Sequence, residues 1–154
     1  MRTSILLAVL TLSAASKPVL AQSDAGSTQA ARAELQADRT KLVAANLQLT
    51  DAEAAKFWPL YEEYRGKQNR LDDRALSIID DYAKNYDNLS DEKAKELIKG
   101  SLDLEKDRLD LRRSYLGKFE KVLPWKKVAR YYQIERKLDA AIQYEGAQAI
   151  PLAK

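Results

Sequence analysis

The stretch LTDAEAAKFWPLYEEY, residues 49–64, contains the clearest structural signals in this sequence of 154 residues. Thr50, followed three residues later by a glutamate, is the pattern of a capping box, in which two side chains satisfy backbone N–H groups at a helix start. Phe57 and Trp58 follow and supply a large apolar surface. Pro59 comes directly after them, and because proline lacks a backbone N–H, we expect the helix to bend there.

The same pattern occurs a second time, 74 residues further along the chain. Each unit has a leucine, a helix-starting residue, four other positions, an alanine, a basic residue and two adjacent aromatics. The shared positions are Leu49, Thr50, Phe57 and Trp58 in the first unit and Leu123, Pro124, Tyr131 and Tyr132 in the second. Adjacent side chains point about 100° apart on a helix, so one aromatic of each pair can face a core. We interpret the units as equivalent helix starts at the two ends of a long helical hairpin.

The region between the two units predicts a pair of long antiparallel helices. Over residues 51–86, apolar and aromatic side chains recur at alternating spacings of four and three, which is a helical stripe. A polar break follows, where Ser90 can cap a second helix over residues 91–122. No segment of the chain alternates apolar and polar residues as a half-buried strand does.

Two shorter helices are expected outside this hairpin. Residues 29–46 form a weakly apolar helical segment, and residues 125–144 follow a proline that suits a helix start. Gly146 stands where a helix commonly stops. The sequence therefore predicts one all-α domain of four helices over residues 29–154.

The helix expected at residues 91–122 has more apolar surface than one neighbouring helix can cover. Two leucine rows with a spacing of seven border about half of its circumference. One row is Leu102, Leu109 and Leu116, and the other is Leu97, Leu104 and Leu111. The first row is the candidate apolar binding face. Because the hairpin is thin, we expect a second copy of the chain to cover part of this surface in a homodimer.

Residues 1–21 have the features of a secretory signal peptide. Arg2 gives a positive start, the apolar run at residues 5–12 is too short to span a bilayer, and small residues end the segment. Residues 22–28 are small and polar and are expected to form a flexible leader. No later segment approaches about 20 continuous apolar residues, so we expect no integral membrane anchor. Together with the absence of cysteine, these features predict a periplasmic protein.

The composition argues against an enzyme and against a metal protein. The chain has no Cys and no His, and its one Met is the initiator, so a soft or borderline metal has no nitrogen or sulfur ligand. A histidine base and a cysteine nucleophile are likewise missing. No glycine-rich loop is present to hold a phosphate group. We therefore expect no catalytic residues, no metal site and no cofactor.

Charge is nearly balanced overall but uneven along the chain. A formal net charge of +3 argues against a dedicated nucleic-acid binder. Residues 112–137, however, contain nine basic and two acidic side chains. This run is either a solvated helical surface or a basic pole that meets acidic partners or the acidic half of a second copy. The candidate basic residues are Arg112, Arg113, Lys126, Lys127 and Arg130.

The layout over roughly residues 47–145 resembles the Spy/CpxP-like periplasmic protein family, which has a repeated LTxxQ motif. The corresponding segments are LTDAE at residues 49–53 and LPWKK at residues 123–127. The resemblance implies a four-helix, cradle-shaped antiparallel dimer. It also implies an ATP-independent chaperone, an inhibitory partner of an envelope-stress sensor, or a metal-responsive sensor.

Two functions fit the sequence. The first is an ATP-independent chaperone-like protein that binds non-native envelope proteins in the periplasm. The second is a regulatory or structural partner that binds one specific envelope protein through a helix face. The residues leave both open.

Overall fold

The computed structural model describes residues 25–154, with side chains from Glu34 onward. Four α-helices follow one another along the chain, and a short 3-10 helix joins the second to the third. They are α1 (Ala25–Leu47), α2 (Asp51–Asn85), η1 (Tyr86–Asn88), α3 (Asp91–Phe119) and α4 (Trp125–Ala149). The predicted all-α fold of four helices is confirmed. The predicted signal peptide and residues 22–24 of the predicted leader lie outside the described residues.

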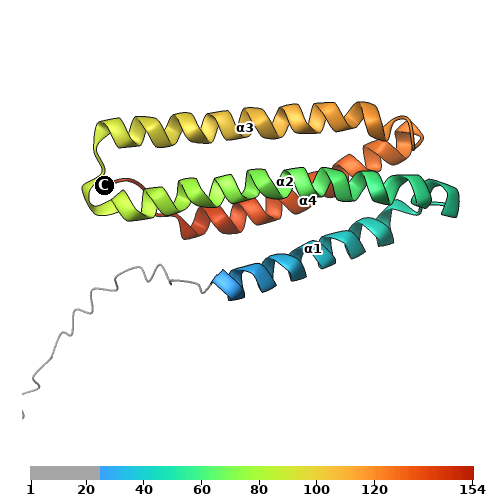
Figure 1. Ribbon diagram of the computed structural model, residues 1–154, viewed down its shortest axis with the longest axis horizontal. Helices are drawn as coiled ribbons and strands as arrows, with labels where there is room; N and C mark the ends of the chain where they lie inside the picture. The colour runs from blue at the N-terminus through green and yellow to red at the C-terminus, as the bar shows by residue number, and fades with distance from the viewer. Residues whose placement is uncertain (1–24) are drawn as a thin grey trace, which may run out of the picture.

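The helices run alternately up and down the molecule, so α1–α2 and α3–α4 are two hairpins that open in the same direction (Figure 1). α2 packs along α3 in the long central hairpin, and α1 packs along α4. The α1–α2 turn and the α3–α4 turn lie at the same end of the molecule, on the right in Figure 1. The α2–η1–α3 connection and the C-terminus lie at the other end. Tyr82 donates there to the carbonyl of Pro151 at 2.9 Å, which ties the tail to α2.

Three helix ends differ from the predicted boundaries. α1 begins at Ala25, inside the predicted leader. α3 ends at Phe119 instead of residue 122, because the chain tightens into turns in which Val122 donates to the Phe119 carbonyl at 3.1 Å. α4 runs past Gly146 to Ala149, so the predicted stop at this glycine is wrong. The helix ends just before Pro151, which disfavours a helical conformation in the residue that precedes it.

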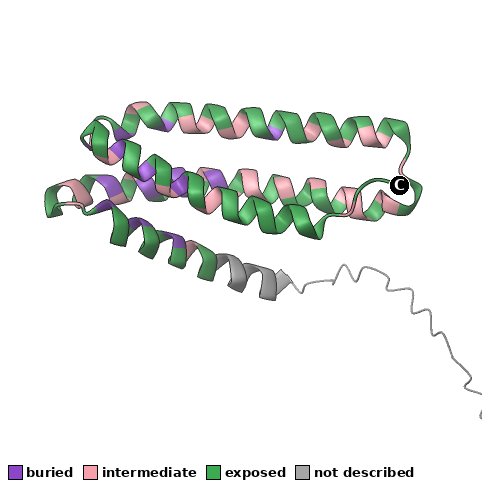
Figure 2. Ribbon diagram, turned by 180° about the vertical axis from the view of Figure 1, so that it is seen from behind, coloured by how far each residue is buried: buried purple, intermediate pink, exposed green. Residues whose placement is uncertain are grey.

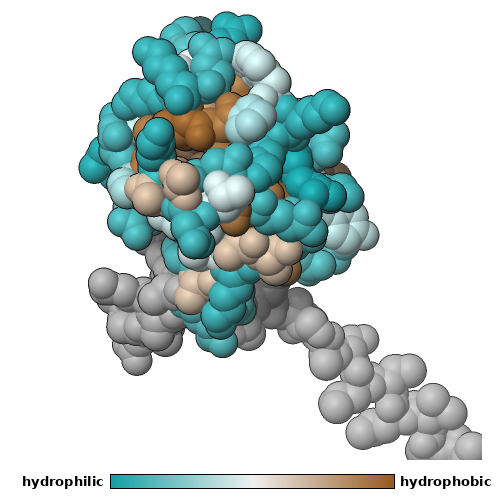
Figure 3. Space-filling model, turned by 90° about the vertical axis from the view of Figure 1, so that its right-hand side faces the viewer, coloured by the Kyte–Doolittle hydropathy of each residue, from teal (hydrophilic) through white to brown (hydrophobic). Residues whose placement is uncertain are grey.

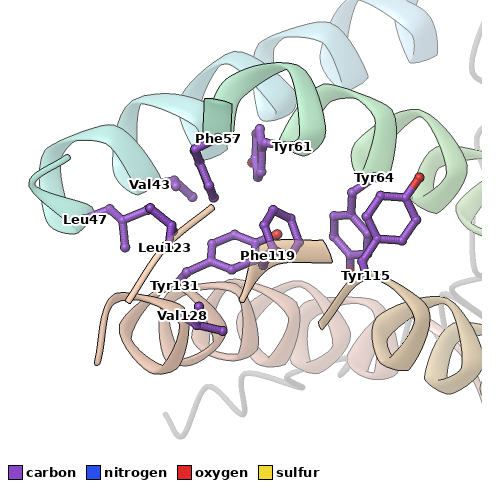
Figure 4. Packing of buried hydrophobic residues seen from close by; sticks show 10 residues of the cluster. All are labelled: Val43, Leu47, Phe57, Tyr61, Tyr64, Tyr115, Phe119, Leu123, Val128 and Tyr131. Carbon is purple, nitrogen blue, oxygen red and sulfur yellow. The ribbon is translucent and has the colours of Figure 1, made fainter. Parts of the chain in front are cut away.

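The hydrophobic core lies at the end of the molecule where the two turns meet. Aromatic rings from three helices form its centre, with Phe57 5.3 Å from Tyr131 and Phe119 4.7 Å from Tyr131 between ring centroids (Figure 4). Val43 and Leu47 of α1 are completely buried against this cluster. Purple residues in Figure 2 gather at this end, whereas the far half of the hairpin shows mostly half-buried and exposed positions.

The first aromatic of each repeated pair faces this core. Phe57 is fully buried and Tyr131 is 4% exposed. Their neighbours are less enclosed, since Trp58 is half-buried and Tyr132 is 43% exposed. The expectation that one aromatic of each pair faces the bundle is therefore confirmed.

The two repeated units lie directly against each other. Three contacts join positions that are 74 residues apart: Glu53 with Lys127 at 2.5 Å, Phe57 with Tyr131 at 5.3 Å between ring centroids, and Tyr61 with Glu135 at 3.4 Å. α2 and α4 both start at this end and run in the same direction (Figure 1). The α1–α2 and α3–α4 hairpins are therefore related by an approximate two-fold arrangement, in which equivalent residues meet.

Truncating Phe57, at the centre of this contact, tests how much the contact contributes to the stability of the fold. Phe57→Ala should lower the free energy of unfolding by about 3–5 kcal/mol, because it removes a buried ring and leaves a cavity among four other rings. Urea denaturation followed by circular dichroism measures the loss. Trp125→Ala is the matched control, since Trp125 is 57% exposed and its removal should cost less than about 1 kcal/mol. Equal losses in the two variants would contradict this account of the core.

Candidate functional site

A groove between α3 and α4 brings together apolar and basic side chains. Its volume is about 230 Å³. Four residues of each helix line it: Leu109, Arg112, Arg113 and Leu116 from α3, and Trp125, Val128, Ala129 and Tyr132 from α4. The turn that follows Phe119 reverses the chain, so the start of α4 lies beside the end of α3. The groove is a consequence of this reversal.

The apolar side chains of the groove are accessible. Leu109 is 42% exposed, Leu116 38%, Trp125 57% and Tyr132 43%. Exposed side chains of this size favour an interaction site when they are contiguous and bordered by charge. At the turn end of the molecule, Figure 3 shows hydrophobic surface in patches that hydrophilic residues border.

The inner end of the groove contains polar groups that lack partners. Arg112, Leu116, Val128 and Tyr132 also line a deeper hollow that extends to Tyr131 and Glu135. Among the described residues, neither the Nε atom of Arg112 nor the hydroxyl of Tyr131 has a hydrogen-bond partner, although both atoms are buried. Burial raises the pKa of Tyr131 further above its ordinary value, and its hydroxyl is protonated at neutral pH. Both groups are hydrogen-bond donors that the described residues around them leave unpaired.

The structure divides the predicted basic pole. Arg112 and Arg113 line the groove. Lys126 and Arg130 are exposed on α4 but are not among the residues that line it. Lys127 points elsewhere: its Nζ donates to Glu53 at 2.5 Å and to the carbonyl of Gln48 at 2.9 Å. Lys127 therefore joins the two helix starts and is not a free charge for a partner.

The predicted apolar face is only partly within the groove. Leu109 and Leu116 line it, and Leu102 lies further along α3 with 58% of its surface exposed. The sequence interpretation missed Trp125. Trp125 and Tyr132 are spaced by seven residues on α4, as Leu109 and Leu116 are on α3, and this matching spacing was the available signal.

The remaining motif residues are structural. Thr50 and Glu53 form the predicted capping box: the Glu53 N–H donates to Thr50 Oγ1 at 3.3 Å, and the Thr50 N–H donates to Glu53 Oε2 at 2.8 Å. The hydrogen bond from Lys127 lowers the pKa of Glu53. Leu123 is buried in the core, Leu49 packs beside it, and Pro124 takes the N-cap position of α4 without a side-chain hydrogen bond.

A buried polar cluster holds α1 against α2 and α4. Arg39 donates to Glu135 at 2.5 Å and to Asp139 at 2.9 Å. Arg65 lies 3.8 Å from Glu135 and donates to Gln36 at 3.2 Å. Burial raises the pKa of Glu135, while the two guanidinium groups oppose this effect. Arg39 and Glu135 are buried and Asp139 is partly exposed, and their ion pairs join α1 to α4.

Breaking this cluster on one side should be costly. Arg39→Met should lower the free energy of unfolding by about 3 kcal/mol, because it leaves buried carboxylates without their closest cation. Adding Glu135→Leu should restore at least about 1 kcal/mol, since one of those carboxylates is then gone. Urea denaturation measures both variants, with Lys41→Met as a control because its ion pair with Asp38 is exposed. Losses that simply add would show that the two groups are not coupled.

Two further properties concern the part of the chain from Ala25 onward. None of its helices combines the length and hydropathy that a membrane crossing demands. The same residues contain no group of three or more acidic, histidine or cysteine side chains placed to hold a metal ion. Comparison with protein-family models, curated proteins and solved structures finds no match to this chain.

Proposed function

We propose that this protein is a periplasmic, ATP-independent chaperone-like protein that binds non-native segments of envelope proteins in the groove between α3 and α4. The observation that carries the proposal is the joining of exposed apolar side chains with unpaired basic groups in one groove. Non-native proteins expose apolar side chains that a folded protein buries. The groove offers such side chains an apolar surface.

The basic groups suit acidic segments. Among the described residues, Arg112 and Arg113 have no ion-pair partner, so their charge is available to a bound molecule. Electrostatic attraction speeds the encounter, and apolar contact slows release. The screening length at physiological salt is about 8 Å, so the capture rate should fall as salt is added.

The location and family rest on the sequence. The signal-like residues 1–21 support export, and the two LTxxQ-like segments support kinship with Spy/CpxP-like proteins. Such proteins need no nucleotide, and no glycine-rich phosphate loop is present in the sequence. No catalysis, metal or cofactor forms part of this proposal.

An aggregation assay tests the groove. The purified protein should suppress aggregation of several unrelated unfolded proteins at near-equal molar ratio, as followed by light scattering. Leu109→Gln with Leu116→Gln should reduce that protection several-fold, because the groove loses its apolar floor. The matched control is Leu35→Gln with Leu42→Gln, which changes two leucines on α1 that are similarly exposed and also spaced by seven residues.

The results of this assay distinguish a general chaperone-like function from a dedicated partner of one protein. Equal protection by the two double variants would remove the groove from client binding. Protection of no test protein, together with tight binding of one envelope protein, would favour the second function, a dedicated regulatory or structural partner. Circular dichroism must show unchanged helix content in both variants.

The homodimer expected from the sequence stays a prediction. Sedimentation velocity of the purified protein at micromolar concentration should give the mass of a dimer, because the core is confined to one end of a thin bundle. A monomer across the whole concentration range would contradict the expectation.

A further inference from the structure

Two parallel rows of exposed side chains run along α3. The apolar row is Ile98, Leu102, Leu109 and Leu116, and the basic row is Lys95, Lys99, Lys106 and Arg113. Each basic residue precedes an apolar residue by three positions, so the two rows are neighbours on the helix surface. Both rows keep the same spacing of four, seven and seven residues.

The rows lie outside the contact between α3 and the rest of the molecule. α3 buries Leu104, Tyr115 and Phe119, whereas all eight residues of the two rows are exposed. The apolar row continues into the groove, since Leu109 and Leu116 line both. From Ile98 to Leu116 the row extends about 27 Å along the helix. It is a long, narrow surface that ends in a hollow beside Trp125 and Tyr132.

The basic row is largely unneutralised. Lys106 pairs with Asp110 at 2.8 Å. Among the described residues, Lys95, Lys99 and Arg113 have no ion pair. Three of the four positive charges beside the apolar row are therefore outside any ion pair in the described part of the chain, although the pKa of Asp110 is lowered by Lys106 and also by the nearby charge of Arg113.

We propose that this double row docks an amphipathic helix that carries acidic residues along one edge. The proposal rests on the proposed function and names the chemistry of the bound segment. A spacing of seven matches the repeat with which two helices interlock their side chains. The apolar residues of the bound helix pack on the leucines of α3, and its acidic edge faces the basic row. A large side chain at its end fills the hollow beside Trp125.

A second copy of this chain suits the surface poorly. In an antiparallel pair of α3 helices, each edge lies against the same edge of the copy, so the basic row would face itself. In a parallel pair it would face the opposite edge, which supplies no acid on α3: Ser101 is exposed there, while Arg108 and Tyr115 are turned toward α2. The homodimer expected from the sequence would therefore form through another face, and not through the leucine row of α3 from which it was predicted.

A lipid surface is also a weaker match. An interfacial helix sinks a broad apolar face into the headgroup region of a membrane. Here the apolar row is one residue wide, Glu105 lies within it, and its end is hollow. A ridge of side chains from another helix fills such a surface better than a flat bilayer.

A pair of synthetic peptides tests the proposal. Both form helices of about 20 residues with leucine at heptad spacing. One carries glutamates along the edge that would face the basic row, and the other carries lysines at the same positions. Fluorescence anisotropy of labelled peptide should show that the purified protein binds the glutamate peptide at least about tenfold more tightly.

Charge reversal on the protein provides the decisive comparison. A row-reversed variant changes Lys95, Lys99, Lys106 and Arg113 to Glu. It should prefer the lysine peptide by a similar factor. The control variant changes Lys56, Arg70, Lys84 and Lys137 to Glu. This set also contains three lysines and one arginine, all exposed. Lys84 pairs with Asp80 four residues away, as Lys106 pairs with Asp110 in the basic row. The control should keep the preference of the unchanged protein.

Every other result overturns the proposal. Equal binding of both peptides, binding of neither, or loss of preference in the control variant removes the basic row as a docking edge. Binding to phosphatidylglycerol vesicles without binding to the peptide indicates a lipid surface instead. A change in sedimentation without a change in peptide preference assigns the row to self-association. If the unchanged protein suppresses aggregation but shows no preference between the two peptides, the proposed function stands while the helix proposal fails.

Discussion

The contact between Phe57 and Tyr131 is the constraint on which the rest of this fold depends. It joins two helix starts that are 74 residues apart, and both turns, the aromatic core and the groove lie around it. Because the core is confined to this end, the far half of the α2–α3 hairpin extends beyond it with little buried surface (Figure 2). The proposed docking surface follows from this distribution of buried residues, since α3 has a side that no other described helix covers.

The polar cluster around Glu135 complements this apolar contact. α1 contributes few large apolar side chains to the core, and Arg39 provides much of its fixed geometry through two carboxylates of α4. A buried ion pair adds less net stability than apolar packing of similar size, but it tolerates few alternative positions. It therefore fixes where α1 sits along α4 more than it strengthens the attachment.

The sequence was informative wherever the signal was local. The capping box at Thr50, the burial of one aromatic in each pair and the long hairpin follow from spacing within a few turns. The groove could not be predicted from the sequence, because its shape depends on the angle between α3 and α4. No local sequence pattern specifies that angle. The ion pair of Lys127 was not foreseen because its partner, Glu53, is distant in sequence, and Arg39 was overlooked because charged side chains are seldom buried. Gly146 misled because a glycine can remain inside a helix at modest cost.

The meeting of equivalent positions has a consequence for how such a molecule can be built. Two identical, separate hairpins with this symmetry would place Glu53 against a second glutamate and Tyr61 against a second tyrosine. The chain instead places lysine against the first and glutamate against the second. The two halves have different sequences within one chain, and this difference lets equivalent positions carry opposite chemistry. Two identical subunits with the same geometry could not form these attractive contacts, because each of these residues would then meet its own copy.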